Sequence, residues 1–201
     1  MPDLDFFAKL GLFVVNDFLN TEECRVLCND IRNAARAPAT VVTDGQSFVD
    51  ISIRNASAAK VTNESRALIM GRLEQLKPNI ENHFNLALTT IEQPHYLRYG
   101  KRDYFSVHAD ADTYPPESSS IPHRKVSAII FLNNQSGKNS KCEYSGGSLI
   151  LYGIMDDPRS KDYGFSVDAV QGQLIAFPAL TLHEVTPVTA GERFTVASWF
   201  Y

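Results

Sequence analysis

The sequence predicts a mainly β protein with helices at its N-terminal end, folded as a sandwich or a jelly roll. From Ile91 onward, short segments rich in β-branched and aromatic residues alternate with Gly, Pro, Asn and Asp, which is typical of strands joined by turns. Before that point, apolar residues recur at helical spacing. The chain has 201 residues, of which 44% are hydrophobic and 21% charged, so a single domain over residues 1–201 is expected.

The first 90 residues are expected to form a helical support region. A short strand at residues 12–15 precedes a helix capped by Asn20 or Thr21. A second helix is predicted over residues 63–85, and Pro78 inside it should kink it or divide it in two. The apolar residues at helical spacing are Cys24, Leu27, Cys28 and Ile31 in the first helix, and Leu68, Ile69, Leu73, Leu76, Ile80 and Phe84 in the second.

Residues 91–201 are expected to form the β core. The predicted strands cover residues 92–99, 104–108, 125–133, 147–152, 169–178, 183–188 and 193–201. Three longer connections remain, at residues 111–124, 134–146 and 153–168, and long loops on a β scaffold often carry binding function. The first of them could act as a lid or be a passive surface loop.

Composition argues against several classes of partner. A net charge of −4 and a pI near 5.7 give no basic surface for nucleic acid. No apolar run reaches the roughly 18 residues that span a bilayer, so no membrane association is expected. The N-terminal residues lack a signal peptide pattern, and three cysteines without closely spaced metal-ligand partners are typical of free thiols. Together these features predict a cytoplasmic protein.

His108, Asp110 and His183 are the candidate metal ligands. His108 and Asp110 are two positions apart on a predicted strand, so both side chains point to the same face. His183 begins a later strand that a jelly roll can bring opposite them. Two imidazoles and one carboxylate can hold Fe(II) while leaving positions open for substrate and dioxygen, although a zinc hydrolase site or a chance pattern would look the same.

Arg193 is the candidate anion-binding residue. It begins the final apolar strand, whose alternation places Thr195 on the same face. A guanidinium inside a barrel needs an anionic partner, and it binds a carboxylate through two parallel hydrogen bonds. The Thr195 hydroxyl could add a hydrogen bond. The alternative is a surface salt bridge from Arg193 to Glu192 or Glu184, which contributes little.

An ordered set of segments resembles the Fe(II)/2-oxoglutarate-dependent dioxygenases, especially the prolyl 4-hydroxylase-like branch. The resemblance covers roughly residues 92–201, and no single motif within it is as specific as the set. The segments that carry it are residues 99–110 with His-Ala-Asp at the end, residues 124–133 ending Phe-Leu-Asn, Ser145-Gly146-Gly147-Ser148-Leu149, Gly172-Gln173-Leu174-Ile175-Ala176-Phe177-Pro178, and residues 183–199.

The resemblance implies a double-stranded β-helix as the catalytic core. His108, Asp110 and His183 would bind iron, and Arg193 would bind the distal carboxylate of 2-oxoglutarate. Tyr99 lies where relatives often place a tyrosine that contacts this cosubstrate, although it could equally be a core aromatic of its strand.

Two positions depart from the pattern of particular relatives. Collagen-type prolyl hydroxylases usually carry lysine where this chain has Arg193. Some oxygen-sensing relatives have a cosubstrate-contacting tyrosine at the position of Phe131. Without that hydroxyl, Tyr99 or Thr195 would have to supply the contact.

The activity implied by the resemblance is that of a dioxygenase using Fe(II), 2-oxoglutarate and O2. It would hydroxylate an aliphatic C–H, most plausibly in a prolyl residue of a protein or peptide, and release succinate and CO2. The same chemistry on a free amino acid or small metabolite is the first alternative. A cupin-like metal- or ligand-binding module without oxygenase activity is the alternative from another class.

Overall fold

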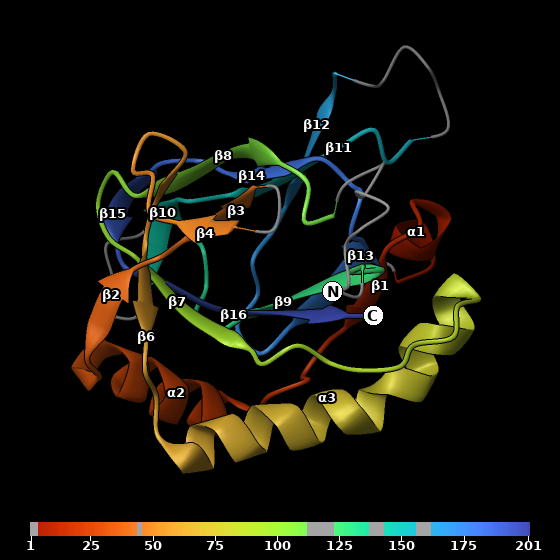
Figure 1. The fold of residues 1–201 in the computed structure, drawn as a ribbon, viewed down its shortest axis with the longest axis horizontal. Helices are drawn as coiled ribbons and strands as arrows, with labels where there is room; N and C mark the ends of the chain where they lie inside the picture. The colour runs from red at the N-terminus through yellow and green to blue at the C-terminus, as the bar shows by residue number, and fades with distance from the viewer. Residues whose placement is uncertain (1–3, 44–45, 112–122, 137–142, 156–161) are drawn as a thin grey trace.

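Two antiparallel sheets face each other, and two helices cover the outer side of the larger one (Figure 1). The computed structural model describes residues 4–43, 46–111, 123–136, 143–155 and 162–201. Within them, the larger sheet has the spatial order β1 (Phe13–Val15), β13 (Leu174–Pro178), β9 (Val126–Phe131), β16 (Arg193–Phe200), β7 (His95–Tyr99), β6 (Ser57–Ala59) and β2 (Arg36–Pro38).

The smaller sheet carries the candidate ligands. Its order is β12 (Gly164–Val167), β11 (Leu149–Tyr152), β14 (His183–Val185), β8 (Tyr104–His108) and β5 (Arg54–Asn55). Two further strand pairs are β10 (Tyr144–Gly146) with β15 (Val188–Gly191), and β3 (Val41–Thr43) with β4 (Gln46–Phe48). The architecture confirms the predicted jelly roll.

The helices α2 (Thr21–Asn33) and α3 (Asn63–Phe84) pack on the larger sheet, and a short α1 (Leu4–Lys9) precedes them. Asn20 caps α2 and forms a capping box with Glu23, as the sequence indicated. The predicted apolar stripes pack against the sheet side chains Phe194, Val196 and Phe200. This cluster packs one face of the larger sheet against the helices, and the other face of the sheet lines the barrel interior.

Of the two effects expected of Pro78, a kink or a division of the second helix, the division does not occur. α3 is continuous from Asn63 to Phe84, with Thr62 as its N-cap and Asn85 in the left-handed conformation at its end. Proline lacks only one backbone donor, and the apolar contacts of Ile69, Leu73 and Ile80 continue on both sides of it.

Alternation along β16 is as predicted. Phe194, Val196 and Phe200 face the helices, whereas Ala197 and Trp199 belong to a second cluster between the sheets with Tyr99. The strand is buried throughout, because β9 and β7 flank it on both sides. Arg193 and Thr195 therefore point into the barrel.

Several strands were not predicted. β1 matches the strand predicted at residues 12–15, but the first 90 residues also add β2 and β6 to the larger sheet and β5 to the smaller one. The predicted strand at residues 183–188 is divided into β14 and β15. β12 lies inside the predicted loop 153–168. Most residues of loop 111–124 lie outside the described residues. The prediction that this loop is a lid or a passive surface loop falls outside them too. No helix in the described ranges is long and apolar enough to cross a membrane.

Candidate active site

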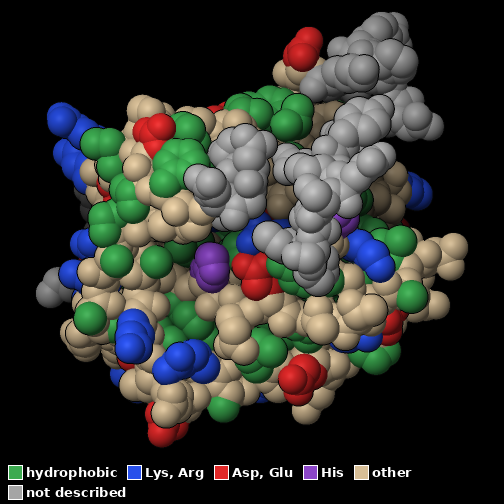
Figure 2. Space-filling view, viewed as in Figure 1, with side chains coloured by type: hydrophobic (Ala, Val, Ile, Leu, Met, Phe, Trp, Pro, Cys, Tyr) green, Lys and Arg blue, Asp and Glu red, His purple; other side chains and the backbone are tan. Residues whose placement is uncertain are grey.

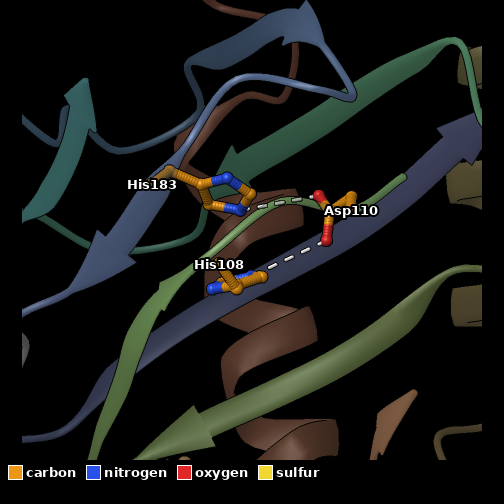
Figure 3. A group of neighbouring side chains, drawn as sticks. All are labelled: His108, Asp110 and His183. Atoms are coloured by element: carbon orange, nitrogen blue, oxygen red, sulfur yellow. Dashed lines mark ion pairs between the residues drawn. The ribbon is translucent and has the colours of Figure 1, made fainter. Parts of the chain in front are cut away.

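The three predicted metal ligands lie together between the sheets (Figure 3). His108 ends β8 and His183 begins β14, and the antiparallel register places these two residues opposite each other. Asp110 follows β8, where the backbone N–H groups of Asp110 and Ala111 both donate to Ala179 O. One potential ligand atom from each side chain lies within 4.8 Å of the others. In the described part of the chain, this is the one group of His, Cys, Asp or Glu side chains with such spacing.

Both imidazoles are fixed through Nδ1. His108 Nδ1 lies 2.8 Å from Ser106 O, and His183 Nδ1 lies 2.9 Å from Thr181 O. A carbonyl oxygen can only accept, so each Nδ1 carries a proton and Nε2 is the ring nitrogen left to bind a metal on the side of Asp110. The Nε2 atoms lie 3.7 Å and 3.5 Å from Asp110 Oδ1 and Oδ2, respectively. These separations leave the donor atoms around one common point.

The protonation states suit metal binding. Burial lowers the pKa of His108 to about 4, and the neighbouring His183 also lowers it, against the opposing effect of Asp110. Burial alone would raise the pKa of Asp110, but His183, His108, the Ser127 hydroxyl and the Trp199 indole together bring it below its usual value. Two neutral imidazoles and one carboxylate are the forms that bind a divalent ion.

Ser127 is a functional candidate that the sequence did not single out. It lies on β9 within an apolar run, is fully buried, and its Oγ donates to Asp110 Oδ2 at 2.7 Å. Asp110 thus has a fixed orientation although it comes from a connection between strands. A lone serine in a buried strand is the only sequence signal for this role.

An aromatic stack supports His108 from the side. The Phe105 ring lies 3.5 Å from the His108 ring, at an interplanar angle of 17°. The Arg54 guanidinium carbon lies 4.5 Å from the Phe105 centroid, and Arg54 Nη1 donates to Thr40 O. β5 pairs with the first two residues of β8, and Arg54 reaches the His108 stack through Phe105, which gives this unpredicted strand a place beside the site.

Arg193 lies at the inner end of the same barrel. Its side chain is 2% exposed, and Nη1 donates to Thr195 Oγ1 at 3.1 Å, as predicted. The alternative surface salt bridge was wrong. Glu192 pairs with Arg32 and Arg98, and Glu184 accepts a hydrogen bond from Tyr152. Among the described residues, no carboxylate forms an ion pair with Arg193.

Aromatic side chains enclose the Arg193 guanidinium. Its carbon lies 5.0 Å from the Tyr99 ring centroid and 5.8 Å from that of Phe131. Tyr144, on β10, is also fully buried beside Arg193, and was not among the predicted site residues. Both side chains pack over Gly147, because a Cβ there would lie 3.1 Å from Arg193 Cδ and 3.3 Å from a Tyr144 ring carbon. The positive φ of Gly147 keeps this space open.

Arg124, Trp199 and Glu92 pack together near Asp110. Arg124 lies flat over the Trp199 ring, 3.7 Å from its centroid, and binds both Glu92 carboxylate oxygens at 2.9 and 2.7 Å. Tyr201 donates to the same carboxylate. The Trp199 indole N–H is buried without a hydrogen-bond partner in the described residues, yet it lies near enough to affect Asp110. The charge of Arg124 is also felt at Asp110.

Near the middle of the face shown in Figure 2, side chains of opposite charge lie close together. Histidine, acidic and basic side chains lie close together there, with hydrophobic side chains beside them. Of the triad, His108 is the most accessible, with 17% of its side chain exposed, compared with 8% for Asp110 and 5% for His183.

The side chains present fit an iron ion and a dicarboxylate. The triad offers two Nε2 atoms and one carboxylate from one side, which leaves the remaining coordination positions free. The buried Arg193 Nε has no hydrogen-bond partner within the described chain, although a buried charge ordinarily requires one. A carboxylate reaching Arg193 from the triad would satisfy it. Tyr99 and Thr195, the other predicted site residues, lie beside Arg193.

A sequence profile of the 2OG-Fe(II) oxygenase superfamily matches residues 94–201, slightly more than half of the chain. A PKHD-type hydroxylase of Nitrosomonas europaea is 25% identical over 191 residues, covering 90% of this chain and 74% of that protein. Another, from Cupriavidus pinatubonensis, is 28% identical over 197 residues, covering 94% of this chain and 77% of its own length. The range matched by the profile includes the candidate ligands and Arg193.

Solved structures show the same fold. A Pseudomonas putida prolyl-4-hydroxylase superposes with a TM-score of 0.71 at 22% identity, covering 98% of this chain and 95% of that one. A Trichoplax adhaerens prolyl hydroxylase, solved with a peptide fragment of a hypoxia inducible factor, gives 0.70 at 16% identity, covering 98% and 86%. The predicted similarity to the prolyl hydroxylase-like branch is confirmed.

Proposed function

Because the chain belongs to the 2OG-Fe(II) oxygenase superfamily, whose members use Fe(II), 2-oxoglutarate and O2, we propose that it hydroxylates a prolyl residue in a protein or peptide. His108, Asp110 and His183 would hold the iron, and Arg193 the distal carboxylate of 2-oxoglutarate. The bound pair supplies the oxygen chemistry, in which 2-oxoglutarate is converted to succinate and CO2 while a substrate C–H is hydroxylated. Family membership favours this enzyme over a binding module without oxygenase activity.

The observation that carries the proposal is the buried Arg193 at the inner end of the barrel that holds the triad. A guanidinium that is 2% exposed, with an unpartnered Nε, favours an anionic ligand at that end. A dicarboxylate extending from there to the triad would place its 2-oxo acid end at the metal. Arg193 would thus orient the cosubstrate, and the metal held by the triad would bind the end that reacts.

The chain's own residues would perform the remaining tasks. Ser106 and Thr181 carbonyls hold the two imidazoles as neutral ligands, and Ser127 orients Asp110. The sheet interior excludes water from the Arg193 end, which strengthens its interaction with a carboxylate. Arg124 and Trp199, on the side of Asp110 away from Arg193, would form part of the surface that the substrate meets.

Two comparisons support a prolyl substrate. One solved neighbour is a prolyl-4-hydroxylase, and another is a prolyl hydroxylase with a bound peptide. A peptide substrate would approach the triad from the exposed side of His108, since this is the most accessible of the three ligands. The same opening admits a small metabolite, so the choice between the two substrates requires an assay.

The test is succinate formation with proline-containing peptides and with a panel of amino acids and metabolites. We expect a peptide to stimulate turnover, His183→Ala to abolish it, and Arg193→Ala chiefly to raise the KM for 2-oxoglutarate. His83→Ala is the matched control, because His83 lies on α3 against Phe13, away from the site. Anaerobic addition of Fe(II) and 2-oxoglutarate should give a visible charge-transfer band.

Different results would contradict different parts of the proposal. Turnover stimulated by a metabolite and by no peptide would overturn the prolyl substrate. An active His183→Ala variant that still binds iron tightly would overturn the ligand assignment. The absence of both the absorption band and 2-oxoglutarate binding by calorimetry would overturn the cosubstrate site.

A further inference from the structure

Two buried polar groups without partners lie side by side at the inner end of the barrel. Tyr144 is 1% exposed and its hydroxyl has no hydrogen-bond partner in the described residues, and the same is true of Arg193 Nε. A buried polar group that is left without a partner destabilises the folded state. Two of them in contact indicate a ligand that both can reach.

Their arrangement shows which part of each group is available. Both side chains approach the same point above Gly147, Arg193 with Cδ, which carries Nε, and Tyr144 with the ring carbon next to the hydroxyl-bearing one. Arg193 Nη1 is already used by Thr195. Arg193 Nε, bonded to the Cδ that lies beside Tyr144, is therefore a donor without a partner in the described residues.

We infer that the Tyr144 hydroxyl donates a hydrogen bond to the distal carboxylate of 2-oxoglutarate, together with Arg193. Tyr144 would thereby supply the hydroxyl that Phe131 lacks, from β10 instead of β9. The Phe131 ring lies beside Arg193, but phenylalanine has no hydroxyl that could donate to the carboxylate. This inference rests on the proposed function, since it names a further contact of the same cosubstrate.

The chemistry of Tyr144 suits this role. Burial raises the pKa of its phenol, and the Arg193 charge and hydrogen bonding from Arg193 oppose that effect only in part, so the hydroxyl keeps its own proton to donate. A protonated phenol can donate to a carboxylate, whereas a phenolate would repel it. Tyr99 is a weaker candidate, because it presents its ring face to the guanidinium. Thr195 already accepts from Arg193, although its own hydroxyl proton remains available.

The test compares two ligands that differ only at the distal end. 2-Oxopentanoate has a methyl group where 2-oxoglutarate has its distal carboxylate. Their dissociation constants are measured anaerobically by calorimetry on the Fe(II)-loaded wild type and on Tyr144→Phe. Tyr96→Phe is the matched control, because Tyr96 is a buried tyrosine whose hydroxyl contacts Ser65 O in the helix-facing core.

We expect Tyr144→Phe to weaken 2-oxoglutarate binding by about 10- to 100-fold, as for a hydrogen bond to a charged group, and to leave 2-oxopentanoate binding within about twofold of wild type. In turnover, the KM for 2-oxoglutarate should rise while kcat stays unchanged. Tyr96→Phe should alter neither affinity. The ratio of the two affinities within one variant is insensitive to a partial loss of folded protein.

Wild-type affinity of Tyr144→Phe for 2-oxoglutarate would overturn the inference, and so would an equal loss for both ligands, which indicates a distorted pocket. Either result leaves the proposed function intact as long as the wild type binds 2-oxoglutarate and Arg193→Ala does not. If the wild type itself does not discriminate between the ligands, the proposed carboxylate site fails, and the contact from Tyr144 with it.

Discussion

At the scale of single residues, the proposed metal ligands depend on neighbours that would bind no metal themselves. Each imidazole is oriented by a backbone carbonyl two positions before it, and Asp110 by the Ser127 hydroxyl. Such outer contacts fix the tautomer and the direction of a ligand, and their loss typically lowers metal affinity by 10- to 100-fold. The same logic predicts how Ser127 contributes.

We expect Ser127→Ala to weaken Fe(II) binding by about tenfold, because Asp110 then loses its fixed orientation and a favourable hydrogen bond. Anaerobic metal titration followed by calorimetry measures the change. Ser65→Ala is the matched control, since the Ser65 hydroxyl donates to the Asp30 carboxylate at 2.6 Å far from the triad. Equal metal affinity in wild type and Ser127→Ala would show that Asp110 does not need this support.

At the scale of elements, turns with left-handed backbone bring the strands into register. Gly172 precedes β13, has φ of +81°, and a Cβ there would lie 2.1 Å from Leu19 O. Its own N–H donates to Phe131 O, and its carbonyl accepts from Leu19 N. One glycine therefore joins β9, β13 and the segment before α2, and a side chain at this position would separate them.

Gly172→Ala should lower the free energy of unfolding by at least about 2 kcal/mol, through left-handed backbone strain and the clash with Leu19 O. Gly71→Ala serves as the opposite case. Gly71 lies inside α3 with open space around it, so alanine there should stabilise the chain by about 0.5–1 kcal/mol. Urea unfolding measures both. A Gly172→Ala protein as stable as wild type would mean that the turn can relax.

At the scale of the whole molecule, the site is assembled from segments distant in sequence. β8 and the residues after it supply two ligands, β14 the third, and β16 the arginine, while β10 adds Tyr144. The metal would therefore connect parts of the chain that separate on unfolding. A ligand that binds only the folded state stabilises it by mass action.

Metal binding should accordingly raise the melting temperature. At a free Mn(II) concentration about 100 times its dissociation constant, the gain is about 2.7 kcal/mol, or about 5–10 °C for a chain of this size. Anaerobic thermal unfolding with and without chelator measures it. His183→Ala should lose most of this shift and His83→Ala should keep it. A shift that persists in His183→Ala would place the metal elsewhere.

The sequence by itself determined the mainly β class, the capped helix after Asn20, the inward face of β16 and the identities of the candidate ligands. These follow from local periodicity and from motifs whose residues share a strand. Their spacing predicted one metal site and one anion-binding arginine, and the structure places all four side chains in one barrel.

Only the tertiary structure decided the rest. Short strands such as β2, β5 and β12 have weak local signals and exist because neighbouring strands complete their hydrogen bonds. Ser127 and Tyr144 look like ordinary core residues in sequence, and their roles depend on Asp110 and Arg193 lying opposite them in space. Polar contacts between distant segments leave no periodic pattern in the sequence. The ligand types could therefore be predicted, whereas the side chains that orient them became visible only once the sheets had closed.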